Sequence, residues 1–266
     1  MEYSLMLLWQ NYWPLVLFIF FGVFLVRRGA SKKLQRQVEQ STAAARREGM
    51  AYVPPGGLDT HQGEIQGTHR FSGTTRGIAW AAEVTVLTPE VGDGMNSRNA
   101  GSLHYTRWTA PEAGIGDGEM LLMTLPEGVK RPPAAASAGG FLGGLAAKAA
   151  WAASQFYLRA SFGNERANAL SLTPENHVAL PDDNFGQTFV AFASHPDLLG
   201  RLSPAARDWL LKGRGGKAAF LWDRQGLSLT WPTAQIKPEE VAACAEYGAV
   251  LAGLLRGVVP AADGSV

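Results

Sequence analysis

The sequence predicts an α+β fold, with an N-terminal single transmembrane helix and stalk followed by a mainly antiparallel sheet packed with helices. Three observations support this prediction. A long uncharged apolar segment opens the chain. Short runs of aromatic and β-branched residues, bounded by glycine and proline, follow it and are typical of antiparallel strands. Helical patterns come after several of these runs, which favours α+β over an all-β fold.

The apolar segment is the strongest signal in the sequence. The 22 residues from Leu5 to Val26 carry no charge, and about 20 apolar residues suffice to span a membrane. Their stretch "LVLFIFFGVFL" is apolar on every face, as expected for a helix surrounded by lipid. We therefore assign residues 1–26 as a transmembrane anchor, and place Trp9, Tyr12 and Trp13 at the membrane interface.

Basic residues after the apolar segment predict its orientation. Those assigned to the membrane interface are Arg27, Arg28, Lys32 and Lys33. Because positive flanks stay in the cytoplasm, we expect the N-terminus outside and the C-terminal body in the cytoplasm, at the inner (cytoplasmic) membrane. A cleaved signal peptide is the alternative, but its basic residues would precede the apolar run.

Residues 27–52 are predicted to form a basic helical stalk. Within residues 27–48, seven Lys or Arg and two Glu give a net charge of +5. Leu34 and Val38 form only a thin apolar stripe, which predicts a solvated helix rather than a coiled coil. The remaining body, residues 49–266, is weakly acidic, so we expect no nucleic-acid partner.

Proline- and glycine-rich segments divide the body. The predicted parts are a β-rich region (53–130), an Ala/Gly-rich linker and helix (131–165), an α+β region (166–258) and a loose tail (259–266). The stretch 141–163 is long enough to span a membrane but contains Lys148 near its middle. We expect this helix to pack on protein or lie at the bilayer surface, with a second span as the alternative.

Turn and capping residues predict the individual elements. Two strands, 63–73 and 75–87, are expected to flank a turn at Gly73–Thr74. Ser203 followed by Pro204 predicts the start of a helix, and Pro238 predicts the start of the last one. The further predicted strands are 102–110, 119–125, 187–194, 217–223 and 227–231.

Stretches that resemble known catalytic motifs do not have the residues or the spacing that those motifs require. "GRGGKA" (213–218) lacks the first glycine and the hydroxyl of a phosphate-binding loop. "HPD" (195–197) is interpreted as a strand-to-helix turn, and Asp182–Asp183 as a solvated loop. Cys244 is expected to be a buried residue on a helix. We therefore predict no catalytic residues, no cofactor and no metal.

Eight tryptophans remain to be explained. Trp9 and Trp13 belong to the membrane segment, and the others fall in predicted strands and helices. They are expected to fill the core, or to mark a partner interface if several are exposed together. The candidates for such an interface are Trp80, Trp108, Trp151, Trp209 and Trp231.

These observations favour a non-catalytic accessory or assembly subunit of a larger integral membrane protein complex. Its expected partners are membrane lipid and that complex. The alternative is a membrane-tethered enzyme or small-ligand sensor whose site is assembled from scattered residues. A polar pocket with shifted pKa values favours the alternative, whereas a broad exposed apolar face favours the subunit.

Overall fold

The structure is a computed structural model of the 266-residue chain. The part of the chain that it describes comprises residues 32–56, 60–61, 64–65, 67–87, 103–124, 151–152, 155, 158–159, 162, 164–213, 219–232 and 237–257.

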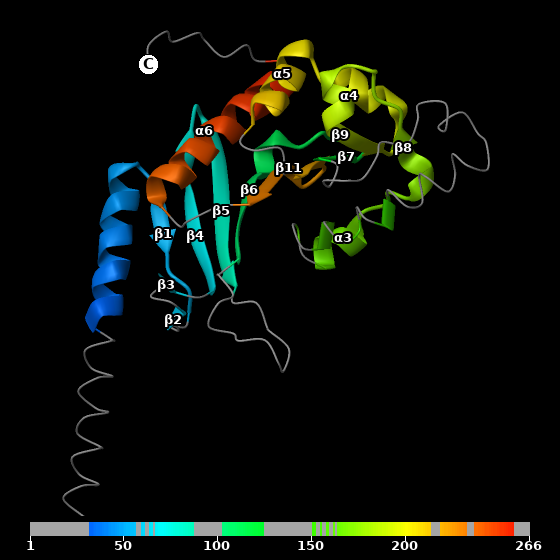
Figure 1. The fold of residues 1–266 in the computed structure, drawn as a ribbon. Coiled ribbons are helices and arrows are strands. Elements are labelled where there is room, and N and C mark those ends of the chain that lie inside the picture. The colour runs from blue at the N-terminus through cyan, green and yellow to red at the C-terminus, as the bar shows by residue number, and fades with distance from the viewer. Residues whose placement is uncertain are drawn as a thin grey trace, which may run out of the picture.

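Within these residues, nine strands form one antiparallel sheet (Figure 1). Their spatial order is β1 (Ala51–Val53), β4 (Gly67–Thr75), β5 (Ile78–Leu87), β6 (Leu103–Ala110), β11 (Gly226–Pro232), β10 (Ala219–Asp223), β7 (Met120–Thr124), β9 (Phe189–Ala193) and β8 (His177–Val178). A small separate hairpin consists of β2 (Thr60–His61) and β3 (Glu64–Ile65). With several helices packed on the sheet, this confirms the predicted α+β class and the antiparallel pairing.

The C-terminal hairpin β10–β11 lies between two strands that are neighbours in the sequence. β11 pairs with β6 and β10 pairs with β7, so the hairpin separates β6 from β7. The predicted regions 53–130 and 166–258 consequently contribute strands to one sheet rather than to two separate ones.

The turn between β4 and β5 differs from the predicted one. We expected it at Gly73–Thr74, but these residues lie inside β4 and the turn is at Arg76–Gly77. Both turn residues have positive φ, 52° for Arg76 and 75° for Gly77. Positive φ at both central residues is the geometry of a two-residue hairpin turn, whose twist matches that of the strands. Gly73 instead lies against the ring of Trp80, which leaves little space for a side chain.

Helices cover one face of the sheet. Helix α6 (Pro238–Leu255) packs across β4, β5 and β6, and α5 (Pro204–Lys212) packs on α6 (Figure 1). At Gly248, an added Cβ would lie 2.7 Å from the ring of Trp108, so this glycine allows α6 to approach the sheet closely. As predicted, Ser203 caps α5, accepting a hydrogen bond from the Ala206 amide (3.2 Å), and Pro238 begins α6.

Helix α4 (Asn184–Thr188) lies beside α5 and occupies the first two residues of the predicted strand 187–194. Asp183 caps it by accepting a hydrogen bond from the Gly186 amide (2.9 Å), a local signal that we did not use. Short 3₁₀ helices complete the connections: Pro111–Ala113, Pro174–Asn176 and Pro196–Arg201. The last begins at Pro196, inside "HPD", with two residues between it and the end of β9 (Phe189–Ala193), which confirms the predicted strand-to-helix turn.

On the opposite face of the sheet, the described residues form a cover over β10, β7 and β9. There, helical residues between 151 and 162, together with α3 (Asn164–Ala169), form a second apolar core. Leu158 and Phe162 are buried against Leu121, Phe192 and their neighbours. The described residues of the stretch 141–163 thus pack on protein, one of the two arrangements that we expected.

The helix of residues 32–47, blue in Figure 1, ends beside β1. Its last turn and the following loop contact the main core through Ala45 and Met50, which are both buried. Leu34, Val38 and Thr42 are half-buried on the same side. The helix therefore differs from the freely solvated stalk that we predicted, because one of its sides is covered along most of its length.

The predicted membrane segment lies outside the described residues, as do Trp9, Tyr12, Trp13, Arg27 and Arg28. Among the residues that are described, no helix combines the length and the hydropathy needed to cross a membrane. Lys32 and Lys33 are described, and both are exposed in the first turn of helix 32–47.

Candidate functional site

One row of side chains crosses the sheet on the face opposite α6. The side chains of this row are largely polar on β4, β5, β6 and β11, and they are apolar on β10, β7 and β9. In order across the strands, the row consists of Val53, Arg70, Glu83, Arg107, Thr230, Ala219, Met123 and Val190.

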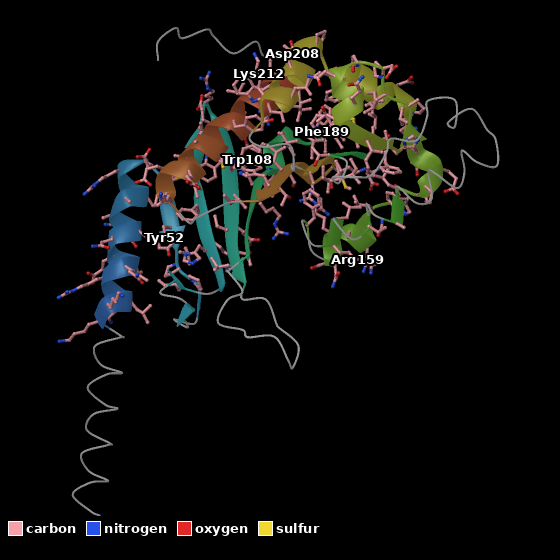
Figure 2. The ribbon with its side chains drawn as sticks, in the orientation of Figure 1. Tyr52, Trp108, Arg159, Phe189, Asp208 and Lys212 are labelled. Atoms are coloured by element: carbon pink, nitrogen blue, oxygen red, sulfur yellow. The ribbon has the colours of Figure 1, made fainter. Side chains whose placement is uncertain are left out.

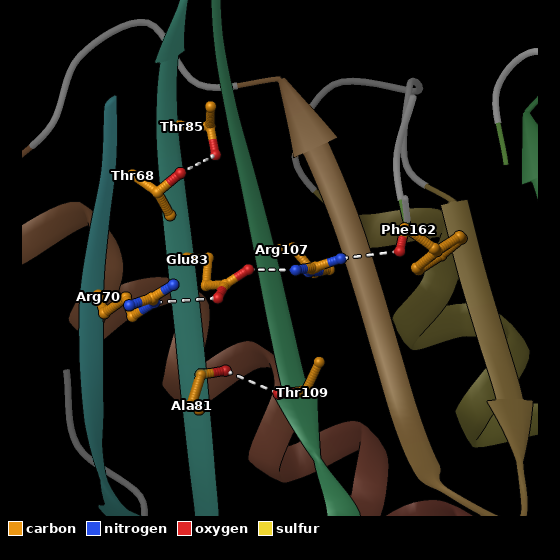
Figure 3. A network of polar contacts seen from close by, with 8 residues as sticks. All are labelled: Thr68, Arg70, Ala81, Glu83, Thr85, Arg107, Thr109 and Phe162. Atoms are coloured by element: carbon orange, nitrogen blue, oxygen red, sulfur yellow. Dashed lines mark hydrogen bonds and ion pairs between the residues drawn. The ribbon is translucent and has the colours of Figure 1, made fainter. Parts of the chain in front are cut away.

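Glu83 binds two arginines at the polar end of this row (Figure 3). Arg70 donates from Nε to Oε1 at 3.3 Å, and Arg107 donates from Nη2 to Oε2. Burial alone would raise the pKa of Glu83, but the hydrogen bonds and charges of Arg107 and Arg70 outweigh it and lower this pKa below its ordinary value. Glu83 is therefore held as a carboxylate.

Arg107 also connects the open half of the sheet to the covering helices. Its Nη1 donates to the Phe162 carbonyl oxygen at 2.8 Å (Figure 3). Nearby, Thr109 donates to the Ala81 carbonyl oxygen at 3.2 Å. The polar side chains thus fix the position of the chain at Phe162, immediately before α3.

A second ion pair joins α3 to the hairpin β10–β11. Nη2 of Arg166 lies 2.9 and 3.0 Å from the two carboxylate oxygens of Asp223. The side chains are 17% and 8% exposed, so both charges are largely removed from water. Asp223 also accepts a hydrogen bond from the Gln225 amide (2.8 Å), which orients its carboxylate. Removing either charge would leave the other buried without its partner.

These ion pairs border two adjoining open hollows, which we call together the polar groove. The first hollow, about 440 Å³, lies between α3 and strands β5 and β6. The second, about 430 Å³, lies between α3 and the loops at the ends of β7, β9 and β10. Arg166, Ala169 and Gln225 line both hollows and so join them. The other lining residues are Ala81, Glu83, Arg107, Thr109, Asp117, Gly118, Glu119, Phe162, Glu165, Leu170, Ser171, Ser194, His195, Asp223 and Arg224.

Hydrogen bonds hold the wall of the second hollow. Glu119 accepts from the amide and the hydroxyl of Ser171 at 2.8 and 2.9 Å, and its own amide donates to Ser194 Oγ at 3.0 Å. Arg224 donates to Asp117 at 2.9 Å in an exposed ion pair. The loop "GIGDGE" (114–119) therefore forms one side of the groove, with positive φ at Gly116 and Gly118.

The tryptophans proposed for a partner interface have other positions. Trp80, Trp108 and Trp231 are 5%, 0% and 7% exposed and belong to the main core, so the interface interpretation does not apply to them. Trp151 is half-buried and packs edge-on against Phe192. Trp209 stacks on Tyr247, and each donates a hydrogen bond to the backbone oxygen of the other (3.1 and 3.2 Å).

Cys244 is buried on α6, as predicted. Its sulfur accepts a hydrogen bond from Trp231 Nε1 at 3.0 Å. This contact fixes the indole of an adjacent strand, which is a structural role.

His69 is buried and takes part in a hydrogen-bonded chain between β1 and β4. Its Nε2 lies 3.1 Å from the Ile65 carbonyl oxygen, which can only accept, so Nε2 carries a hydrogen. In the neutral ring, Nδ1 then accepts from the Tyr52 hydroxyl, at 2.8 Å. Burial raises the pKa of Tyr52 to about 12, so this hydroxyl remains a donor.

Across the described ranges, no three His, Cys, Asp or Glu side chains gather into a group that could hold a metal ion. Four of the five acidic residues of the groove, Glu83, Asp117, Glu119 and Asp223, instead bind arginines or a serine.

Sequence reasoning missed the groove because its residues are far apart in the chain. Glu83, Arg107, Arg166 and Asp223 come from two strands, a helix and the hairpin at the C-terminal side. One signal was available. Glu83 and Arg107 are single charges inside apolar strand patterns, "AAEVTVL" and "HYTRWTA". Such charges alternate with core residues and mark the face turned away from the core.

Comparisons with models of protein families, with curated proteins and with solved structures found no match to this chain.

Proposed function

We propose that this chain is a single-pass membrane protein of the inner (cytoplasmic) membrane, whose cytoplasmic body binds a segment of a membrane protein complex in the polar groove. In this proposal the chain is a non-catalytic accessory or assembly subunit. Residues 1–26 anchor it, with the N-terminus outside. The observation that carries the proposal is the groove, formed by two joined hollows along α3.

The shape and chemistry of the groove fit an extended polypeptide. Both hollows are open clefts, and their junction at Arg166, Ala169 and Gln225 makes them continuous. Gln225 and His195 are exposed and offer hydrogen-bonding groups, and Glu165 offers a carboxylate. An extended segment needs both donors and acceptors along its path, because its own peptide groups carry one of each.

The internal ion pairs support a binding role. In the groove, Arg107 binds Glu83 and Arg166 binds Asp223. Charges held in this way fix the shape of the walls before a ligand arrives, which reduces the entropy lost on binding.

Site-specific photocrosslinking in intact membranes tests the proposal. A photoreactive amino acid replaces Gln225, which is exposed and lines both hollows. The matched control replaces Ala205, which is exposed on α5 over the opposite face of the sheet. We expect a discrete cross-linked membrane protein from position 225 and none from position 205.

A cross-link of equal intensity from both positions would show that the groove is not the binding surface. Recovery of all the protein in the soluble fraction would contradict the anchor.

A membrane-tethered enzyme or small-ligand sensor is the second candidate. The polar lining of the groove and the lowered pKa of Glu83 meet the condition stated above for this alternative, and the volume of each hollow also favours it. About 430 Å³ lies within the range of roughly 300–1,000 Å³ typical of small-molecule sites. In that case, position 225 would give no protein adduct, and a polar metabolite would raise the melting temperature of the wild type but not of the variant Ala169→Trp.

A further inference from the structure

Helix 32–47 exposes a one-sided basic surface. Successive residues of an α-helix are rotated by about 100°, so residues three, four and seven apart lie on one side. The side turned to the body contains Leu34, Val38, Thr42 and Ala45, all buried or half-buried. The outward side, which we call the basic face, carries five exposed cations and the single acidic residue Glu39. The cations are Lys32, Lys33, Arg36, Arg46 and Arg47.

The cations of the basic face have no anionic partners in the described part of the chain. In the body, five of the eleven described Lys and Arg residues form ion pairs with carboxylates. These five are Arg70, Arg76, Arg107, Arg166 and Arg224. The other six, Arg159, Arg201, Arg207, Lys212, Lys237 and Arg256, form no ion pair with the described residues and are distributed over several elements. The basic face is distinct because it gathers five such cations on one side of a single helix, where an external anion can approach them.

Helix 32–47 is packed on the body, so it cannot rotate about its own axis and turn the basic face in another direction. Ala45 and Met50 are buried in the main core, 0% and 4% exposed. A solvated stalk could rotate about its axis, whereas this helix and the body move together. Any surface that binds the basic face therefore also sets the orientation of the sheet and of the groove.

We propose that the basic face of helix 32–47 lies along an anionic membrane surface and binds its lipid phosphates. Charge complementarity supports this partner, and the adjacent apolar segment brings the helix to the bilayer. The cytoplasmic leaflet is the anionic one, which agrees with the orientation proposed above. The inference deepens the proposed function, since it specifies how the anchored body is held.

The length of the helix distinguishes this arrangement from an upright one. Lys32 and Arg47 are about 22 Å apart along the axis, at about 1.5 Å per residue. Lipid charges are screened within about 8–10 Å at physiological salt. An upright helix would therefore leave Arg46 and Arg47 beyond the field, whereas a helix lying along the surface brings all five cations within it.

Depth-dependent fluorescence quenching tests the proposal on the full chain. A fluorophore is attached at Ala43→Cys, an exposed position in the middle of the basic face. The native Cys244 is buried, so the introduced thiol is the one that reacts. The protein is placed in nanodiscs of phosphatidylcholine, with or without roughly 30% phosphatidylserine, that contain a quencher at headgroup depth. Ala205→Cys on α5 is the control position.

We expect strong quenching at position 43 in the anionic discs, and little in neutral discs or at position 205. Replacing Lys33, Arg36, Arg46 and Arg47 by Gln should reduce it to the neutral level. These side chains make no ion pair within the described residues, so the melting temperature should stay unchanged. The absence of quenching at position 43 in anionic discs would overturn the proposal, as would equal quenching in both lipids.

Extraction of the same samples at alkaline pH tests the transmembrane anchor of residues 1–26 separately from lipid binding by the basic face. If the chain is extracted, the anchor is wrong. Quenching that still requires phosphatidylserine would then support the basic face alone, and its absence would overturn both. If the chain resists extraction without quenching, only the basic face is contradicted.

Discussion

The two halves of the sheet face opposite α6 differ in a way that explains where the groove lies. Over β10, β7 and β9 the face is apolar and is covered by the residues around Leu158 and Phe162. Over β4, β5 and β6 it carries Arg70, Glu83 and Arg107 (Figure 3), and the Arg70 side chain is 65% exposed among the described residues. Covering an apolar surface is favourable, whereas covering the ion pairs would remove charges from water. The covering helices therefore end where the polar half begins, and the polar groove lies along that boundary.

The boundary falls on β11, where two buried hydroxyl groups lack a hydrogen bond in the described part of the chain. Ser228 and Thr230 face the same side as Arg107 and are buried. Their hydroxyl groups make no hydrogen bond with the described part of the chain. The side chains that surround the two halves are visible together in Figure 2.

Loss of packing in the apolar half should have the largest effect on stability. Leu121 is fully buried between Leu221 and Phe192, and Leu121→Ala should lower the free energy of unfolding by about 3–5 kcal/mol. Thr109 lies in the polar half of the same face, across the strands from Leu121 through Leu221 and Ser228. Thr109→Ala is therefore the matched control, with an expected loss of about 0.5 kcal/mol. Urea unfolding measures both. Equal losses would show that the two halves do not differ as described.

Breaking the buried ion pair at the boundary should have an intermediate effect. Asp223→Asn keeps the size of the side chain but leaves the charge of Arg166 without its partner, at a cost of about 2–3 kcal/mol. The exposed pair offers a control, because Asp117→Asn should cost no more than about 0.5 kcal/mol. Thermal unfolding at neutral pH distinguishes them. A stability loss for Asp223→Asn as small as for the control would contradict the role assigned to this pair.

Replacing Glu83, the carboxylate in the polar half of the sheet, should lower the free energy of unfolding by a smaller amount, and this amount should depend on pH. The pKa of Glu83 is lowered in the folded state, so its ionised form stabilises the fold fully above the unfolded pKa of about 4.3. That contribution is lost as the pH falls through the lower, folded pKa. Glu83→Gln should therefore cost about 1 kcal/mol at pH 7, and the difference from wild type should shrink below about pH 4. A difference independent of pH would contradict the ion-pair explanation.

The smallest expected change in the free energy of unfolding is an increase, whereas the other variants lower it. Thr230→Val replaces a buried hydroxyl that lacks a partner by a methyl group of similar size. Removing an unsatisfied polar group should raise the free energy of unfolding by up to about 1 kcal/mol. A loss of stability, measured by urea unfolding, would show that the hydroxyl does have a partner in solution.

The features that sequence reasoning found are local. Ser203 and Pro204 mark the start of α5 because capping involves residues only three apart. The turn at Arg76–Gly77 was missed because arginine rarely adopts positive φ and Gly73 was the more obvious turn residue. The insertion of β10–β11 between β6 and β7 was not predictable, since alternation shows which face a residue occupies but not which strand lies beside it. The groove depends on such long-range neighbours, Arg166 with Asp223 above all.

Co-purification of groove variants shows directly whether the polar groove binds a membrane-protein partner. The tagged full-length chain is extracted in mild detergent as wild type, as Ala169→Trp, and as Asn168→Trp. Ala169 is exposed and lines both hollows, whereas Asn168 is exposed and lines neither. We predict a stoichiometric membrane-protein partner with the wild type and with Asn168→Trp, and a loss of at least about tenfold with Ala169→Trp. A monomer or homo-oligomer from the wild type, or full retention of the partner by Ala169→Trp, would contradict the account.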